Sequence, residues 1–370
     1  MDFELSEEQV MLRDVSRDAL RSHCTPDQVR AWAGDAFAQD AGLWKLGTGL
    51  GWTGLAAPEE HGGSAQGLTE LCLVAEELGR SAAPGPFATT ALVGLALTRA
   101  KASAGSGAVP AALAAGTAAA TWAAADTTGS TTLATPLDDG GYRLDGRKTL
   151  VQDAGRTSWL LVSARTPDGP ALFLVSGDLP GLAVRRQRTV DLSRAFHEVV
   201  LDGVRVPAGQ LLPLGADQRR WIADAAAVLT AADALGAGER LLEMTVEYVT
   251  VRRQFGRAIG GFQAVKHKCA DMLMTLRGSR AAVSYAAMAL DADAPDAARA
   301  ASAAKAFVPD GVSRVAGEAL QLHGGIGFTW EHDLHLYLRR AKADQVLHGD
   351  AAFHEDRLCA LLVAERATAG

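Results

Sequence analysis

The chain has 370 residues and a formal net charge of −7; 48% of its residues are hydrophobic and 21% are charged. This length predicts two or three packed units, and the negative charge argues against binding nucleic acid through a broad basic surface. The four cysteines are scattered without a Cys-x-x-Cys pair, which argues against a metal site and favours a reducing, cytoplasmic compartment. We expect no signal peptide at the acidic start and no membrane span.

Residues 1–115 are predicted to form a helical domain. Ser6 and Gln9 form a capping box, in which each side chain bonds the backbone amide of the other residue, so a helix should begin here. A glycine- and proline-rich break follows at 51–63. The next amphipathic segment, 68–78, is predicted to end at Gly79 as a C-cap.

Residues 116–212 change to a strand pattern. Short apolar runs at 142–151, 159–162, 171–175, 182–184 and 199–201 are separated by glycine and aspartate clusters at hairpin-like distances. They predict a small antiparallel β domain, a barrel or a sandwich. The alanine-rich stretch 108–125 before them is interpreted as a helix and a connection.

Residues 213–370 return to a helical pattern. Four segments, 216–252, 262–291, 295–323 and 332–366, are dense in strong helix formers. Short, glycine-marked connections between long helices predict an antiparallel four-helix bundle. The expected fold class is therefore α+β, with a middle β domain between two helical domains.

The connections of the bundle carry residues suited to a phosphate-bearing ligand. Arg252 ends the first long helix next to Gly256, and Gln321 precedes the glycines of the turn 324–327. A planar guanidinium pairs two phosphate oxygens, and glycines let backbone N–H groups approach a ligand closely. The residues alone leave a second interpretation open, in which Arg252 pairs with a carboxylate and the glycines only cap helices.

The order of the helical and strand-rich regions, together with six local motifs, resembles the acyl-CoA dehydrogenase family of flavoproteins. The motifs lie at 5–9, 54–63, 144–148, 252–263, 270–272 and 321–328. The resemblance implies FAD as cofactor, an acyl-CoA substrate and an oligomer in which one subunit holds the ADP half of its neighbour's FAD. It assigns that half to residues of the bundle connections: Arg252, Gln254, Phe255, Gln263, Gln321, Gly324 and Gly325.

The family reaction removes an α-proton with a carboxylate base while the flavin accepts a β-hydride. By resemblance, the usual glutamate position is His348, and the position used by a minority of members is Ala226. Neither residue is a carboxylate. His348 as a base near neutral pH, Asp233 as a base and Asp350 in a cofactor role are weaker alternatives.

Other positions on the substrate and flavin-ring side also depart from the family pattern. The flavin-lining segment keeps only Gly129 and Ser130, and Asp153 stands where the family usually has asparagine. The acidic residue of the substrate-binding pair is kept as Asp224, but the arginine position is Ala227. The motifs for the ADP half are intact.

Two hypotheses follow. The first is a base-lacking subunit that donates the ADP half-site to a homologous catalytic partner, as in heteromeric actinobacterial members that this chain resembles at 339–350. The second is a self-sufficient acyl-CoA or acyl-carrier dehydrogenase with an unusual base, working as a homo-oligomer. Both predict an oxidoreductase of lipid metabolism that uses FAD, with no metal, nucleic acid or membrane as a partner.

Overall fold

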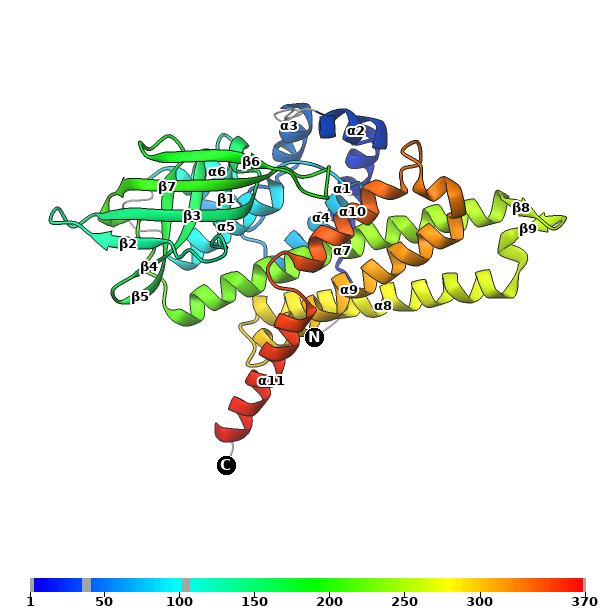
Figure 1. Ribbon diagram of the computed structural model, residues 1–370. Helices are drawn as coiled ribbons and strands as arrows, with labels where there is room; N and C mark the ends of the chain where they lie inside the picture. Colours follow the sequence, from blue (N-terminus) through cyan, green and yellow to red (C-terminus); the bar gives the residue numbers. More distant parts are fainter. Residues whose placement is uncertain (1–2, 35–40, 102–106, 369–370) are drawn as a thin grey trace.

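The computed structural model describes residues 3–34, 41–101 and 107–368. Helices form both ends of the sequence and strands its middle, and the sheet lies at one end of the molecule beside a long helical bundle (Figure 1). The first helices are α1 (Glu7–His23), α2 (Pro26–Gly34), α3 (Ala41–Gly49), α4 (Leu68–Arg80), α5 (Phe87–Arg99) and α6 (Val109–Ala114), with a short 3-10 turn at Glu59–His61.

The capping box at the start of α1 is confirmed. Ser6 Oγ accepts a hydrogen bond from the Gln9 backbone N–H at 3.2 Å, and Gln9 Oε1 accepts from Ser6 N–H at 3.0 Å. The amino end of α4 is capped by a residue that is distant in the sequence. The carboxylate of Asp291 accepts hydrogen bonds from Leu68 N–H at 2.7 Å and from Thr69 N–H at 2.9 Å. The first helical layer is thus attached to the bundle.

Gly79 is not the C-cap that the sequence predicted, because α4 continues to Arg80. It is needed for a close crossing of α4 with the bundle. A Cβ on Gly79 would lie 1.9 Å from the Asp233 carbonyl oxygen, and a Cβ on Gly236 would lie 1.8 Å from that of Glu76. Two glycines therefore let the two helix backbones touch.

The middle region is one seven-stranded sheet of β1 (Ala120–Ala123), β2 (Leu133–Pro136), β3 (Tyr142–Gln152), β4 (Trp159–Thr166), β5 (Gly169–Ser176), β6 (Leu182–Gln187) and β7 (Phe196–Val206). The strand order is β1-β4-β2-β3-β7-β6, and β5 pairs with β4. Most pairs are antiparallel, as expected, but β4 pairs in parallel with β1 and β2. The sheet is mixed because these two short strands, which the sequence analysis missed, join it.

The bundle contains α7 (Ala216–Val251), α8 (Gln263–Asp291), α9 (Ala297–His323), α10 (Leu334–Val346) and α11 (Ala351–Thr368). The first three match their predicted bounds closely. The predicted helix 332–366 is wrong as one helix, because the backbone turns at His348 (φ 56°) and Gly349 (φ 97°). The buried Lys305 ammonium of α9 donates to the Gly349 carbonyl oxygen at 2.6 Å across this turn.

Small elements connect the long helices. A two-stranded hairpin of β8 (Arg253–Gln254) and β9 (Arg257–Ala258) and a 3-10 turn η5 (Ile259–Gly261) join α7 to α8, and η6 (Gly324–Phe328) follows α9. The helix α11 projects away from the body of the molecule (Figure 1). In the described part of the chain, no helix has the length and apolarity that crossing a membrane requires.

Candidate functional site

The first candidate region is the end of the bundle where α7 stops, here called the bundle end. The hairpin of β8 and β9 that follows α7 turns sharply between its strands, since Phe255 has φ 53° and Gly256 has φ 79°. This turn holds the Phe255 ring 91% exposed. The side chains of Arg252, Gln254 and Gln263 are also exposed around the same hairpin.

The end of α9 lies at this same end of the molecule. The Tyr248 ring in the last turn of α7 stacks on the His323 ring of α9 with 4.6 Å between centroids. Gln321 precedes this histidine and is exposed, and Gly324 follows it at φ 61°. A Cβ placed on Gly324 or Gly325 would meet no atom within 4 Å, so the backbone here is open to a ligand.

The bundle end therefore brings together all seven residues that the resemblance assigns to the ADP half of FAD. Among the described residues, no carboxylate pairs with Arg252, and the side-chain amides of Gln254, Gln263 and Gln321 have no hydrogen-bond partner. A free guanidinium, free amides, an exposed aromatic ring and open glycine backbone are groups that bind a pyrophosphate and its nucleoside. The residues present fit this half of the cofactor.

The second candidate region is the turn between α10 and α11, which carries His348. The His348 imidazole stacks on the indole of Trp122, with ring centroids 5.8 Å apart and an interplanar angle of 15°. Trp122 comes from β1, and its Nε1–H donates to Ser163 Oγ of β4 at 3.0 Å. The stack joins the turn directly to the sheet, and we call it the Trp122–His348 stack.

The surroundings of the exposed His348 disfavour its protonated form. The pKa of His348 is lowered to about 4, first because packing around the ring removes water from the charged form, and then because Lys305 and Arg194 add nearby positive charge. The residue as a whole keeps solvent-accessible surface, so the stack does not seal it from water. The pKa of Lys305 is itself lowered to about 8 by burial. The stack thus occupies the position that the resemblance assigns to the usual base glutamate.

The other base candidates are engaged within the fold. Ala226 is buried in α7 and offers no polar group. The Asp350 carboxylate accepts a hydrogen bond from Phe353 N–H at 2.9 Å, so it caps the start of α11. This contact supports a structural interpretation of Asp350 over a cofactor role.

Asp224 keeps an arginine partner, although Ala227 replaces the expected arginine. Both oxygens of the buried Asp224 carboxylate accept hydrogen bonds from Arg357 of α11, one of them at 2.9 Å. Burial raises the pKa of Asp224, and the Arg357 guanidinium opposes this shift. The carboxylate that the sequence assigned to substrate binding therefore fastens α11 to α7.

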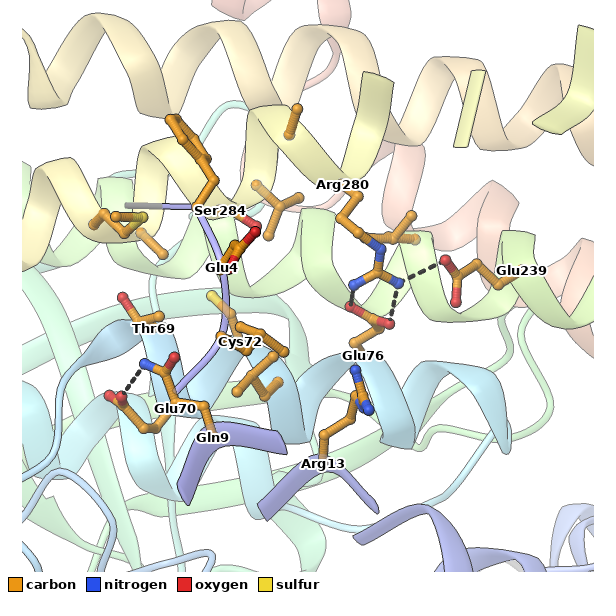
Figure 2. A pocket seen from close by; sticks show the side chains of 18 of the residues that line it. Glu4, Gln9, Arg13, Thr69, Glu70, Cys72, Glu76, Glu239, Arg280 and Ser284 are labelled. Carbon is orange, nitrogen blue, oxygen red and sulfur yellow. Dashed lines mark hydrogen bonds and ion pairs between the residues drawn. The ribbon is translucent and has the colours of Figure 1, made fainter. Parts of the chain in front are cut away.

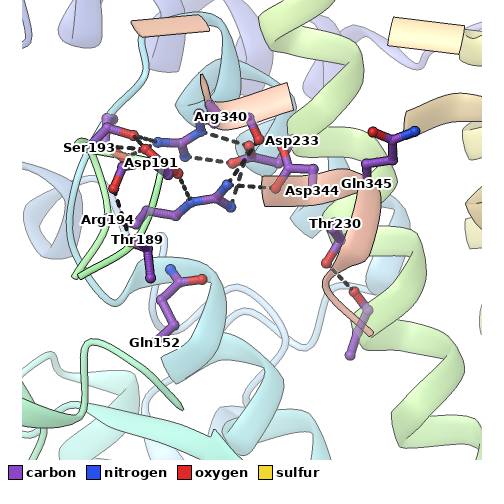
Figure 3. Close-up of polar contacts among 12 residues, drawn as sticks. Gln152, Thr189, Asp191, Ser193, Arg194, Thr230, Asp233, Arg340, Asp344 and Gln345 are labelled. Carbon is purple, nitrogen blue, oxygen red and sulfur yellow. Dashed lines mark hydrogen bonds and ion pairs between the residues drawn. The ribbon is translucent and has the colours of Figure 1, made fainter. Parts of the chain in front are cut away.

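Asp233 belongs to a buried network of charges between the sheet and the bundle (Figure 3). Arg340 of α10 donates to both Asp233 oxygens at 2.7 and 2.6 Å. Arg194, after β6, contacts Asp191 at 2.6 Å and Asp344 at 2.7 Å. Burial raises the pKa of Asp344 well above its usual range. These contacts saturate Asp233 and support its structural interpretation.

Sequence reasoning missed Trp122, Lys305 and the charge network. A weak signal for the network existed, since Arg339 and Arg340 stand together on α10, but only Arg340 is buried. Trp122 gave no signal, because the sequence could not show that β1 faces the α10–α11 turn.

Comparison with known proteins identifies the family. Residues 6–109 match the N-terminal domain model of acyl-CoA dehydrogenases, and residues 215–361 match the C-terminal domain model. The chain belongs to the acyl-CoA dehydrogenase family. It is 34% identical over 358 residues to the acyl-CoA dehydrogenase IpdE2 of Mycobacterium tuberculosis, covering 94% of this chain and 93% of the relative.

Two solved structures of heteromeric family members are similar over the whole chain. The ChsE4-ChsE5 complex from Mycobacterium tuberculosis matches with a TM-score of 0.92 and 30% identity, covering 98% of this chain and 99% of the other. A variant of the Tcur3481-Tcur3483 steroid ACAD matches with a TM-score of 0.89, 32% identity and the same coverage.

Proposed function

We propose that this chain is the base-lacking subunit of a heteromeric acyl-CoA dehydrogenase. In this assembly, its bundle end holds the ADP half of an FAD whose reactive ring lies in a homologous partner chain. The single observation that carries the proposal is the Trp122–His348 stack. By the resemblance, a catalytic member has its carboxylate base at this position, whereas this chain carries an imidazole that stacks against the sheet and has a pKa lowered to about 4.

The residues of the bundle end have defined roles in this proposal. Arg252 would pair the pyrophosphate, the glycines at 324 and 325 would let backbone amides approach it, and the exposed Phe255 would cover the nucleoside. Bound FAD accepts the β-hydride of the acyl-CoA thioester. The similarity to subunits of ChsE4-ChsE5 and of a steroid ACAD supports a heteromer and a bulky acyl group.

One observation favours a second function, a self-sufficient acyl-CoA or acyl-carrier dehydrogenase with an unusual base. A cleft of about 630 Å³ remains beside Trp122, between the sheet and the start of α7. Arg219 and Arg220 line it from α7, and Lys148 and Asp126 line it from the sheet, where they form an ion pair at 2.7 Å. A cleft with arginines suits a phosphate-bearing thioester.

Co-expression separates the two functions. The chain is expressed alone and with a homologous chain that carries the base glutamate, and the flavin content of each preparation is measured. The heteromer is expected to form an equimolar complex with one FAD for every two chains, and this chain alone should bind little flavin. A stable homo-oligomer with one FAD per chain and acyl-CoA turnover would establish the second function and exclude the first.

A further inference from the structure

Two parts of the helical bundle are held together by different kinds of contact. In the cavity of about 1200 Å³ between α1, α4, α7 and α8, ion pairs do this, since Arg280 of α8 donates to both oxygens of Glu76 of α4, at 2.9 and 2.6 Å (Figure 2). At the bundle end, three aromatic rings take this role, and we call them the ring cluster: Tyr248, His323 and His332. The ring cluster contains none of the seven residues assigned to FAD, but it adjoins both connections that carry them.

His323 lies at the centre of the ring cluster. Only 2% of the residue is exposed, and its Nδ1–H donates to the Ala319 carbonyl oxygen at 2.8 Å. The imidazole stacks on Tyr248 at an interplanar angle of 21°, and His332 packs against it edge-to-face with 4.7 Å between centroids. Burial lowers the pKa of His323, which favours the uncharged ring. The hydrogen bond and the two neighbouring rings together fix the orientation of the imidazole.

The glycine turn folds back over His323. Gly324 follows this histidine at φ 61°, a conformation that favours glycine. A Cβ on Gly327 would lie only 3.0 Å from the His323 Cβ, so the backbone of the turn touches the end of α9 there. The chain then returns to the imidazole through the ring of His332. The segment 324–332 is thus fastened to His323 at both of its ends.

Tyr248 connects the same imidazole to the other half of the site. Its backbone carbonyl oxygen accepts a hydrogen bond from Arg252 N–H at 2.9 Å, which closes the last turn of α7. The Arg252 carbonyl oxygen in turn accepts from Ile259 N–H at 2.8 Å and closes the hairpin. The stack of Tyr248 on His323 is therefore a direct contact between the connection that carries Arg252 and the connection that carries the glycines.

We infer that Tyr248 and His323 are positioning residues of the ADP half-site, and that their stack holds the glycine turn where it binds the pyrophosphate together with Arg252. This inference rests on the proposed function. Neither ring needs to touch the cofactor, because the stack acts by keeping the two connections in their binding arrangement before FAD arrives. Without the stack, FAD would have to order the glycine turn as it binds, and its affinity would fall.

The test measures the Kd of the heteromer for FAD by fluorescence titration. Tyr248→Leu removes a half-buried ring and should raise this Kd about tenfold, which corresponds to ordering the backbone of about one residue on binding. The conservative variant Tyr248→Phe keeps the stack and should restore the affinity of the wild type. Tyr285→Leu is the matched control, since it removes a tyrosine that stacks on Phe3 near the carboxyl end of α8, away from the bundle end, and should leave the Kd unchanged. His323→Leu should act like Tyr248→Leu and provides a second variant.

A double variant separates positioning from a general loss of stability. If Tyr248→Leu and Arg252→Ala acted independently, their effects would multiply to about a hundredfold rise in Kd. Positioning predicts a rise of about thirtyfold or less, because a displaced turn cannot weaken a contact with Arg252 that is already gone. Full multiplication, or unchanged FAD binding by Tyr248→Leu and His323→Leu while Arg252→Ala weakens it, would overturn the inference and leave the proposed function standing. Unchanged binding by Arg252→Ala as well would overturn both.

Discussion

The bundle end and the α10–α11 turn both carry polar and aromatic side chains. Those of the bundle end lack partners in the described chain, whereas those of the turn have them. At the bundle end, Arg252 and three glutamines extend into solvent without partners in the described chain. At the turn and the charge network behind it, His348, Asp350 and Asp233 each contact another part of the same chain. The difference indicates that the first region is built for a molecule outside the chain, whereas the second is satisfied within it.

The strongest test of this difference is to remove a charged side chain from each of the two regions and compare the effects. Arg340→Ala leaves the Asp233 carboxylate buried without its bidentate partner, so the free energy of unfolding should fall by about 3–5 kcal/mol. Urea unfolding followed by circular dichroism measures this loss. Arg314→Ala, which removes only an exposed pair, should cost at most about 1 kcal/mol. Equal effects of the two variants would show that the network is not structural.

Arg252→Ala should have the opposite profile. Removing an exposed, unpaired side chain should leave the free energy of unfolding within about 0.5 kcal/mol of the wild type. The affinity of the heteromer for FAD should fall by about 1.5–3 kcal/mol, or roughly tenfold or more in Kd, because a charge-assisted pyrophosphate contact is lost. Flavin absorbance after dialysis at limiting FAD measures it, with Arg253→Ala as the neighbouring control. Unchanged occupancy would place the pyrophosphate elsewhere.

The pH dependence of stability sharpens the comparison within the network. Because the pKa of Asp344 is raised in the folded state, its contribution to stability is fully present below the ordinary aspartate pKa of about 3.9 and is lost as pH rises through the raised value. The wild type should therefore lose stability as the pH rises above about 4, and Asp344→Asn should remove this loss. Each tenfold difference in proton affinity between the folded and unfolded states contributes about 1.4 kcal/mol to it. Urea unfolding of both proteins across this range tests it, and parallel pH profiles would contradict the assignment.

The smallest effect is expected at His348. In an active heteromer, His348→Ala should leave kcat within about threefold, because an imidazole whose pKa is lowered to about 4 is a weak base, whereas a positioned general base contributes about 10²–10⁴-fold. The pH–rate profile should also keep both limbs. A loss of two orders of magnitude, together with a lost acidic limb, would make His348 catalytic and support the self-sufficient enzyme.

Most of the fold could be predicted from local patterns. The helices α7, α8 and α9 are long, rich in helix formers and bounded by short connections that contain glycine or proline, so their ends were found within a few residues. The strands β1 and β2 were missed because each has four residues and alanine contributes little strand signal. The break between α10 and α11 was missed because Lys305, from a distant helix, stabilises it.

The candidate site likewise has one region that could be predicted from the sequence and one that could not. The bundle end follows sequence motifs, since its residues lie within two short connections, and the resemblance places them together. The state of the α10–α11 turn depends on contacts between distant segments. Trp122 meets His348 across 226 positions of sequence, and Arg357, not a neighbour on α7, pairs with Asp224. A single sequence lists these residues without indicating that they touch.

The cap that Asp291 provides for α4 has a consequence for synthesis on the ribosome. The two partners are 223 residues apart, and elongation at about 5–20 residues per second separates their appearance by roughly 10–50 s. During that interval, the first amides of α4 lack their carboxylate, and until α7 has been synthesised the face of α4 that crosses it is uncovered. The amino-terminal helices can therefore complete their packing only after the bundle has been synthesised. A nascent chain stalled before residue 291 would expose unpacked surface to chaperones.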